Sequence, residues 1–432
     1  MTLNWFQIFR LGLVQMCLGA IVVLTTSTLN RLMAVELSLP AVLPGALVAL
    51  HYGIQISRPA WGFRSDTQGN RTRFIVLGMA VLGAGALLAS YAITVIDAAF
   101  WTGLLLSILA YSLIGLGVGA SGTSLLALVA TATAPRRRAA AATITWLMMI
   151  FGIALTAASV GILLDPYSGA RLLMITAGLV TLALVLTLVA VMGIERQVIA
   201  VPAQNAPTPL LVGLKEVWAE RRARDFTIFV FLSMVAYFLQ ELILEPYAGL
   251  VFGLTPGQST QLSGAQNGGV FLGMLTVGAA LSGFRIGTLR GWIVAGCLGS
   301  AAALGVIAQQ GMVQGPYLTP SVVMLGVFNG VFAVSAIGAM MSLAGEGRQA
   351  REGTRMGLWG AAQALAAGFG GLLGTAAVDI LRLFLADAPA FGAVFLVEAM
   401  LFVMAAALAM QVISSAPVGR RMPDVRGAKH EI

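Results

Sequence analysis

The sequence predicts an all-α integral membrane protein, a bundle of twelve transmembrane helices in two six-helix halves. Composition is the first observation: of 432 residues, 59% are hydrophobic and only 10% are charged. A soluble globular protein carries about 25% charged residues, so this chain could not cover its apolar surface in water. The number of long apolar stretches and the uneven placement of Lys and Arg are the other two observations.

The apolar stretches are identified by length, because a spanning helix needs about 20 mostly apolar residues. Twelve stretches qualify along the chain. They are residues 11–29, 40–57, 74–96, 102–130, 140–163, 171–193, 226–243, 260–283, 289–309, 319–343, 357–381 and 391–413.

The positions of Lys and Arg predict the orientation, since cytoplasmic loops carry an excess of these residues. With the N-terminus inside, 22 of the 25 Lys and Arg fall on cytoplasmic segments, and Arg31, Arg171 and Arg382 fall outside. Both termini are therefore expected in the cytoplasm. The net charge of +8 follows from this topology, so the bilayer is the expected partner and nucleic acid is not.

The longest stretch between spans predicts the division of the chain. Residues 194–225 contain three prolines and then an amphipathic piece with Leu210, Leu214 and Trp218 at helical spacing. We expect an N-terminal half at 1–193, a cytoplasmic linker with an amphipathic helix at 194–225, a C-terminal half at 226–415, and a cytoplasmic tail at 416–432.

Enzymatic and metal chemistry find little support in the sequence. Cys17 and Cys297 lie inside apolar runs, and His51 and His430 have no motif-like spacing to them, so neither a disulfide framework nor a zinc site is expected. No phosphate-binding loop, Gly-x-Ser-x-Gly elbow or His-Glu-x-x-His pattern occurs. We therefore expect no catalytic residues, no metal and no built-in cofactor.

The loop between the second and third spans carries a motif that resembles the major facilitator superfamily. Gly62, Asp66, Gly69 and Arg71 match its Gly-x-x-x-Asp-Arg-x-Gly-Arg-Lys/Arg signature, whereas Thr67 and Asn70 replace arginines. Glycines allow a tight turn, and Asp66 could cap a helix start and pair with Arg71. An ordinary cytoplasmic turn is the alternative interpretation.

Paired glycines support a repeat of one half in the other. Gly115/Gly119 in span four and Gly326/Gly330 in span ten occupy corresponding places, and such G-x-x-x-G pairs suit close helix crossing. Span four has no charged residue, and span five has no proline. The proton relay usual in proton-coupled members of this superfamily is therefore not expected.

Longer stretches resemble a narrower family, the PucC/LhaA-type bacteriochlorophyll delivery proteins of phototrophic bacteria. The similarity is strongest over residues 30–66, including Leu43 to Tyr52, and over residues 239–253. It implies a bacteriochlorophyll carrier or assembly factor in the bacterial inner (intracytoplasmic) membrane, with bacteriochlorophyll or a precursor as ligand. Antenna polypeptides and pigment-synthesis enzymes are the implied partners. A secondary transporter of an unrelated small molecule, and a scaffold that docks pigment-synthesis enzymes and antenna polypeptides, are the alternatives.

Three ionisable or amide side chains inside spans are candidate pigment-binding residues, because charged groups in hydrocarbon are costly. His51 is the only intramembrane histidine, and a neutral imidazole suits the magnesium of a chlorin; a histidine hydrogen-bonded within the bundle is the alternative. Gln55 lies one turn away on the same face. Glu398 lies about seven residues inside span twelve, facing either a protein neighbour or an aqueous crevice.

Opposite charges at the outer ends of spans one and seven predict a latch between the halves. Arg31 and Glu36 lie at one of these ends and Glu241 and Glu245 at the other, where Pro246 is expected to end the helix. We expect Arg31 to contact Glu241 or Glu245, and a substrate site is the alternative role.

Overall fold

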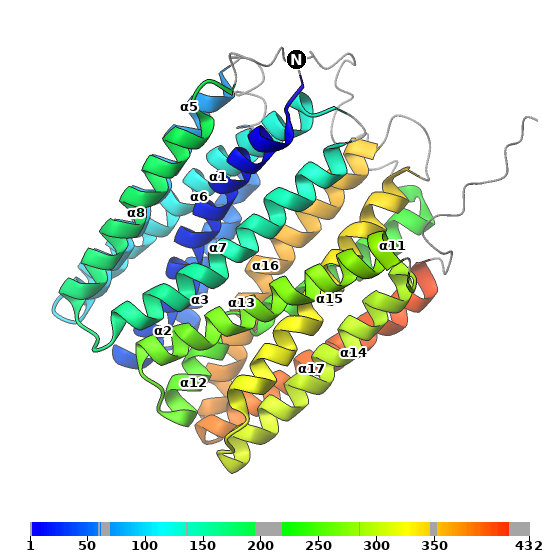
Figure 1. Ribbon diagram of the computed structural model, residues 1–432. Helices are drawn as coiled ribbons and strands as arrows, with labels where there is room; N and C mark the ends of the chain where they lie inside the picture. The colour runs from blue at the N-terminus through cyan, green and yellow to red at the C-terminus, as the bar shows by residue number, and fades with distance from the viewer. Residues whose placement is uncertain are drawn as a thin grey trace, which may run out of the picture.

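The computed structural model describes residues 2–58, 61, 70–134, 137–194, 218–284, 286–345 and 352–413. All of the regular structure in these residues is helical, and helices account for each of the twelve expected spans (Figure 1). The α-helices are α1 (Trp5–Val23), α2 (Leu29–Arg31), α3 (Val42–Ile54), α5 (Arg71–Ile96), α6 (Phe100–Ala132), α7 (Arg138–Leu164), α8 (Gly169–Val191), α11 (Arg221–Leu239), α12 (Leu244–Phe252), α13 (Pro256–Gly278), α14 (Leu289–Val313), α15 (Leu318–Gly345), α16 (Glu352–Arg382) and α17 (Asp387–Val412).

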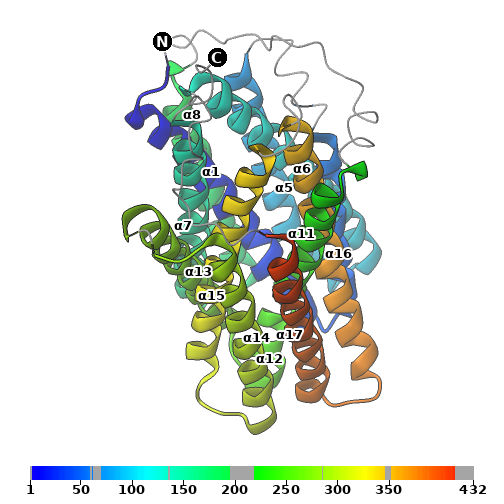
Figure 2. The same cartoon turned by 90° about the vertical axis from the view of Figure 1, so that its right-hand side faces the viewer.

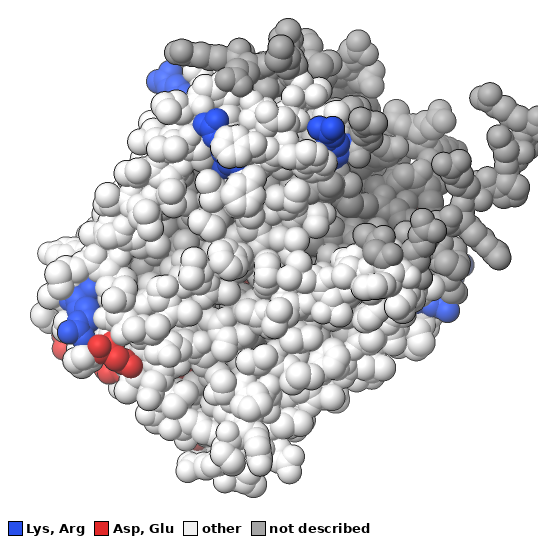
Figure 3. Space-filling model, viewed as in Figure 1, with Lys and Arg blue, Asp and Glu red and all other residues white. Residues whose placement is uncertain are grey.

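Ten helical stretches among the described residues are long and apolar enough to cross a membrane. The other two expected spans are the shorter apolar helix Val42–Ser57 and α13, which contains several Gln, Ser and Asn residues. On the face shown in Figure 3, charged side chains gather toward the two ends, with a broad uncharged band between them. The chain is a multi-pass membrane protein, and we call the end of the bundle opposite the N-terminus the outer end, following the predicted orientation.

The buried apolar residues form one large cluster in each half of the chain. One cluster runs from Leu3 to Ile194 and includes a single residue of the second half, Leu242; the other runs from Phe226 to Ile413. The halves meet where α3 packs on α16 and α7 packs on α13. Most of the 194–225 linker, with its expected amphipathic helix, lies outside the described residues.

Equivalent helix crossings in the two halves depend on the paired glycines. A side chain at Gly115 would meet the His51 carbonyl, so α6 approaches α3 closely; one at Gly330 would collide with the Val270 carbonyl, so α15 approaches α13 closely. Close crossing is confirmed at Gly115, Gly326 and Gly330, whereas a side chain at Gly119 would make only ordinary contact with the Trp61 ring. Spans two and four are joined in this way, as are spans eight and ten.

The seventh span departs from the expectation of one helix ended by Pro246. The break comes earlier, because α11 ends at Leu239 and residues 240–243 form a turn before α12 begins. Pro246 lies in the first turn of α12, where the N–H that proline lacks has no helical partner in any case. The prediction that Pro246 ends the helix was therefore wrong.

Candidate functional site at the seam between the halves

The first and seventh spans are both interrupted at corresponding places, on the outer side of the bundle. In span one, π-helical segments at Leu24–Thr28 and Leu32–Glu36 flank the single turn α2. In span seven the turn at 240–243 separates α11 from α12. Such irregular backbone at membrane depth is tolerated only where it is buried in protein or lines a cavity, and in transporters it marks the substrate region.

Asn30 joins the two interruptions directly. Its side-chain amide donates a 2.7 Å hydrogen bond to the Leu242 carbonyl, whose usual helical partner would be the N–H of residue 246, and Pro246 has none. Asn30 is 1% exposed, and its own Oδ1 has no hydrogen-bond partner among the described residues. Thr28, just before α2, has its hydroxyl 3.3 Å from that of Thr260 in α13, so a buried polar stripe of span one faces the second half.

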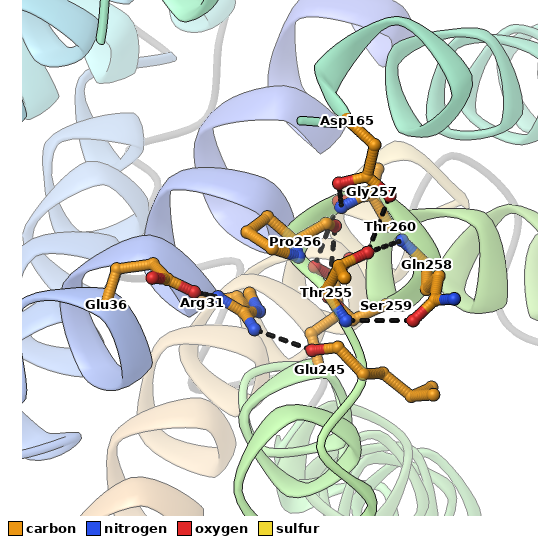
Figure 4. Close-up of polar contacts among 11 residues, drawn as sticks. Arg31, Glu36, Asp165, Glu245, Thr255, Pro256, Gly257, Gln258, Ser259 and Thr260 are labelled. Carbon is orange, nitrogen blue, oxygen red and sulfur yellow. Dashed lines mark hydrogen bonds and ion pairs between the residues drawn. The ribbon is translucent and has the colours of Figure 1, made fainter. Parts of the chain in front are cut away.

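Arg31 contributes to the seam by a contact other than the predicted one. The guanidinium, 2% exposed, donates to Glu36 at 2.5 Å and to the Leu254 carbonyl, just after α12, at 2.8 Å (Figure 4). No ion pair between described residues joins Arg31 to Glu241 or Glu245. Glu36 is five residues away on the same span and satisfies the positive charge locally, so the link to the second half goes through a backbone carbonyl.

The two glutamates of span seven lie in different environments. Glu245 is buried in α12, where one carboxylate oxygen lies 3.4 Å from the Thr260 hydroxyl and the other has no hydrogen-bond partner in the described part of the chain. Glu241, in the turn, lines a narrow void together with Tyr52 and Phe238 that is too tight to hold a water molecule. Ligand pockets occupy about 300–1,000 Å³, so this void is too small for a macrocycle in the present conformation.

Two aspartates that were not predicted as site residues join the halves reciprocally. Asp165, at the end of α7, accepts from the Thr255 hydroxyl at 2.6 Å and from the Gly257 N–H at 3.1 Å, which caps the start of α13 (Figure 4). Asp379 of α16 accepts from the N–H groups of Ala41 and Val42 at 3.0 and 2.7 Å, which caps α3.

The two caps occupy corresponding places in the two halves. The carboxylate at the end of span five caps span eight, and the carboxylate of span eleven, its counterpart in the second half, caps span two. A carboxylate at a helix N-terminus satisfies free N–H groups and meets the positive end of the helix dipole. Nearby, burial and the Glu36 carboxylate raise the pKa of the Tyr167 hydroxyl in the loop after α7. The outer seam is thus held by carboxylate caps on both sides.

His51 is part of a hydrogen-bonded chain with Gln55 and Arg58. Arg58 donates to the Gln55 amide oxygen, so the amide nitrogen of Gln55 is the donor in its 2.9 Å contact with His51 Nε2. The ring proton of a neutral His51 therefore resides on Nδ1, which is buried without a hydrogen-bond partner among the described residues. The predicted proximity of Gln55 to His51 is confirmed, and in this arrangement the Nε2 lone pair of His51 is occupied by Gln55.

Glu398 lies elsewhere in the molecule. It is completely buried in α17, and neither carboxylate oxygen has a hydrogen-bond partner within the described ranges. α17 packs mainly against α14 and α11, whereas α3, which carries His51, packs mainly against α6 and α16; α17 also touches α16 but makes no comparable contact with α3. The structure therefore does not bring Glu398 to His51 and Gln55. The sequence left open whether Glu398 faces a protein neighbour or an aqueous crevice, and the structure places its side chain in the protein interior.

The inner-loop motif lies almost entirely outside the described residues. Gly62, Asp66 and Gly69 are not described, and Arg71 is the first residue of α5. The pairing of Asp66 with Arg71 stays a prediction. Asp165 and Asp379 were not identified from the sequence as site residues, because each caps a helix that is distant in sequence. The only sign of them in the sequence was an acidic residue at the outer end of a span.

The chain resembles known proteins over nearly its whole length. The family model described as PUCC protein matches residues 28–416. The "Bacteriochlorophyll synthase 44.5 kDa chain" of Rhodobacter capsulatus is 67% identical over 420 residues, which cover 97% of this chain and 98% of that protein. "Protein PucC" of Rhodovulum sulfidophilum is 27% identical over 87% of this chain and 86% of its own.

Solved structures share the fold at low sequence identity. A D-xylose-proton symporter superposes with a TM-score of 0.74 at 15% identity, over 95% of this chain and 98% of its own. The nucleoside transporter NupG gives a TM-score of 0.67 at 16% identity, over 94% of this chain and 98% of its own. The architecture is therefore that of major facilitator transporters, as the sequence predicted.

Proposed function

The chain belongs to the PUCC protein family, and from this premise we propose that it is a bacteriochlorophyll carrier that supplies pigment to light-harvesting antenna complexes. The 67% identity to a protein named for bacteriochlorophyll synthesis, extended over nearly the whole of both chains, carries the proposal. We further propose that the role is non-enzymatic, which the transporter fold supports. Antenna polypeptides and pigment-synthesis enzymes are the proposed partners, and the bacterial inner (intracytoplasmic) membrane, with both termini cytoplasmic, is the proposed location.

Pigment binding in this scheme requires the halves to separate. The void beside Tyr52 and Glu241 is smaller than a macrocycle, and His51 is 1% exposed. The interrupted spans and the capped outer seam supply the kind of interface that opens and closes in transporters of this fold. Bacteriochlorophyll would then enter between the halves, with His51 and Gln55 on one wall and Glu398 as a separate candidate in the second half.

Purified protein tests the proposal directly. The full chain is extracted in mild detergent, incubated with bacteriochlorophyll, and separated from free pigment, with a sugar symporter of the same fold as the control. Retention of about one pigment per folded chain, well above the control, supports a carrier. Retention equal to the control, with antenna polypeptides co-purifying, contradicts it and favours a scaffold.

A secondary transporter of another small molecule is the second candidate, favoured by the interruption of both spans one and seven beside the buried Glu245. Substrate-driven flux into vesicles, with no pigment retained, is the outcome that selects it.

The hydrogen bond that Gln55 donates to His51 leads to different expectations for variants of the two residues. If the Nε2 atom binds the chlorin magnesium, Gln55 competes with the metal for the same lone pair. His51→Leu is then expected to reduce bound pigment, and Gln55→Leu to retain or increase it. Equal loss of pigment and of thermal stability in both variants would identify a structural pair and remove His51 from the site.

A further inference from the structure

A pocket of about 690 Å³ opens at the inner end of the second half, where α11 and α14 begin and α17 ends. Figure 2 shows these three helices side by side. Arg221, Arg222 and Arg290 form its polar rim with Asp225 and Gln411, and its apolar lining comes from Ile228, Leu408, Met410, Val412 and Ile413. One wall is therefore cationic and another hydrocarbon-like.

The described lining of the pocket carries more positive than negative charge. Asp225 is its one acidic residue beside three arginines, and it lies 3.7 Å from both Arg221 and Arg224. Arg290 is partly buried and makes no hydrogen bond or ion pair with any described residue. A guanidinium offers five N–H donors in a planar fork that matches phosphate, so a partly buried one beside an open pocket favours an anion.

The apolar part of the lining restricts the class of anion. Ile228 is 47% and Met410 is 54% exposed, and both line the pocket. A small soluble ion would leave this surface uncovered, whereas the first carbons of an acyl chain would cover it. The pocket also lies where three spans reach the predicted cytoplasmic surface, which is the depth of lipid phosphates.

We propose that this pocket is a binding site for an anionic phospholipid, with the phosphate held by Arg290 and Arg221 and an acyl chain against Met410 and Ile228. The excess of arginine at cytoplasmic ends explains an inner location for these residues. It does not explain why residues from three helices line one open pocket whose volume is within the range of ligand pockets.

The test measures binding of phosphatidylglycerol to the full-length detergent-purified protein by native mass spectrometry, with phosphatidylcholine as the neutral comparison. Arg290→Gln is expected to weaken phosphatidylglycerol binding about fivefold, the effect of one cationic side chain near a lipid surface. Arg73→Gln is the matched control, because Arg73 is exposed at the inner end of the first half and lies outside the pocket. Its binding is expected to equal that of the parent.

A second variant addresses the apolar wall without removing an arginine. Met410→Asp adds a negative charge where the chain would lie, on an exposed side chain whose change leaves the core intact, and it is expected to weaken phosphatidylglycerol binding as well. Loss of binding in Arg73→Gln equal to that in Arg290→Gln would show diffuse surface attraction and overturn the proposal. Full competition by millimolar inorganic phosphate would also overturn it in favour of a soluble anion.

Discussion

Removing the reciprocal aspartate caps should open the outer seam, and each lost cap should multiply the open population. Asp379→Ala deprives two N–H groups at the start of α3 of their acceptors, and Asp165→Ala removes the carboxylate that caps the start of α13. Loss of an N-cap costs about 1 kcal/mol. The open population should therefore rise about fivefold in Asp379→Ala and about 30-fold in the double variant, since about 1.4 kcal/mol is a factor of ten.

Cysteine accessibility from outside measures that population. Thr28 is 1% exposed and lies against Thr260 across the seam, so Thr28→Cys reacts with a membrane-impermeant maleimide only when the halves part. Cys17 and Cys297 are buried and are first replaced by alanine. The rate of labelling then follows the open population even when the open state is rare.

Two controls separate opening from damage. Asp387→Ala removes a carboxylate at the same end that pairs with Arg382 within the second half, and it should leave the labelling rate unchanged. A cysteine at Ser233, fully buried within the second half, should stay unreactive in every variant. A double-variant rate within about twofold of the parent, or an equal rise with Asp387→Ala, would refute the assignment of the caps to the seam, because two lost caps predict a far larger change.

Three further predictions concern the fold and the pigment. Reporter fusions at Val201 and in the tail should indicate the cytoplasm and one at Gln314 the outside, because Lys and Arg determine orientation; an outside signal at Val201 would overturn the topology. Gly330→Ala should destabilise the protein by about 1–3 kcal/mol through overpacking, whereas Gly305→Ala, with open space around it, should be neutral or stabilising by up to about 1 kcal/mol, as thermal denaturation in detergent can show. His51→Leu should reduce the bacteriochlorophyll retained per folded molecule; lower stability with full retention would indicate a packing role.

The fold was accessible from the sequence because each membrane span can be recognised from its own residues. About 20 apolar residues are required to cross the hydrocarbon whatever their neighbours are, and all twelve expected spans have a helical counterpart. The paired glycines also predicted their own packing, since a missing side chain is useful only where another backbone approaches. The contact of Gln55 with His51 followed from helical spacing alone.

The contacts at the seam between the halves could be predicted from the sequence only in part. Opposite charges at the ends of spans one and seven located the region, and Arg31 does link the halves there. The partner was wrong because Glu36, on the same span, lies close enough to neutralise the guanidinium. The break at 240–243 was missed because the span around it stays largely apolar, and the Leu242 carbonyl, four residues before Pro246, is satisfied by Asn30 from a distant part of the chain.

The sequence by itself determined the class of protein, the number of spans, and the residues that are costly to bury. These properties depend on composition, length and short-range spacing. Only the tertiary structure decided which groups meet across spans: Asp165 meets α13, Asp379 meets α3, and Glu398 has no hydrogen-bond partner in the described chain. Hydrogen bonds act over about 3 Å, and whether two spans bring their donors and acceptors to that distance depends on the packing of both halves.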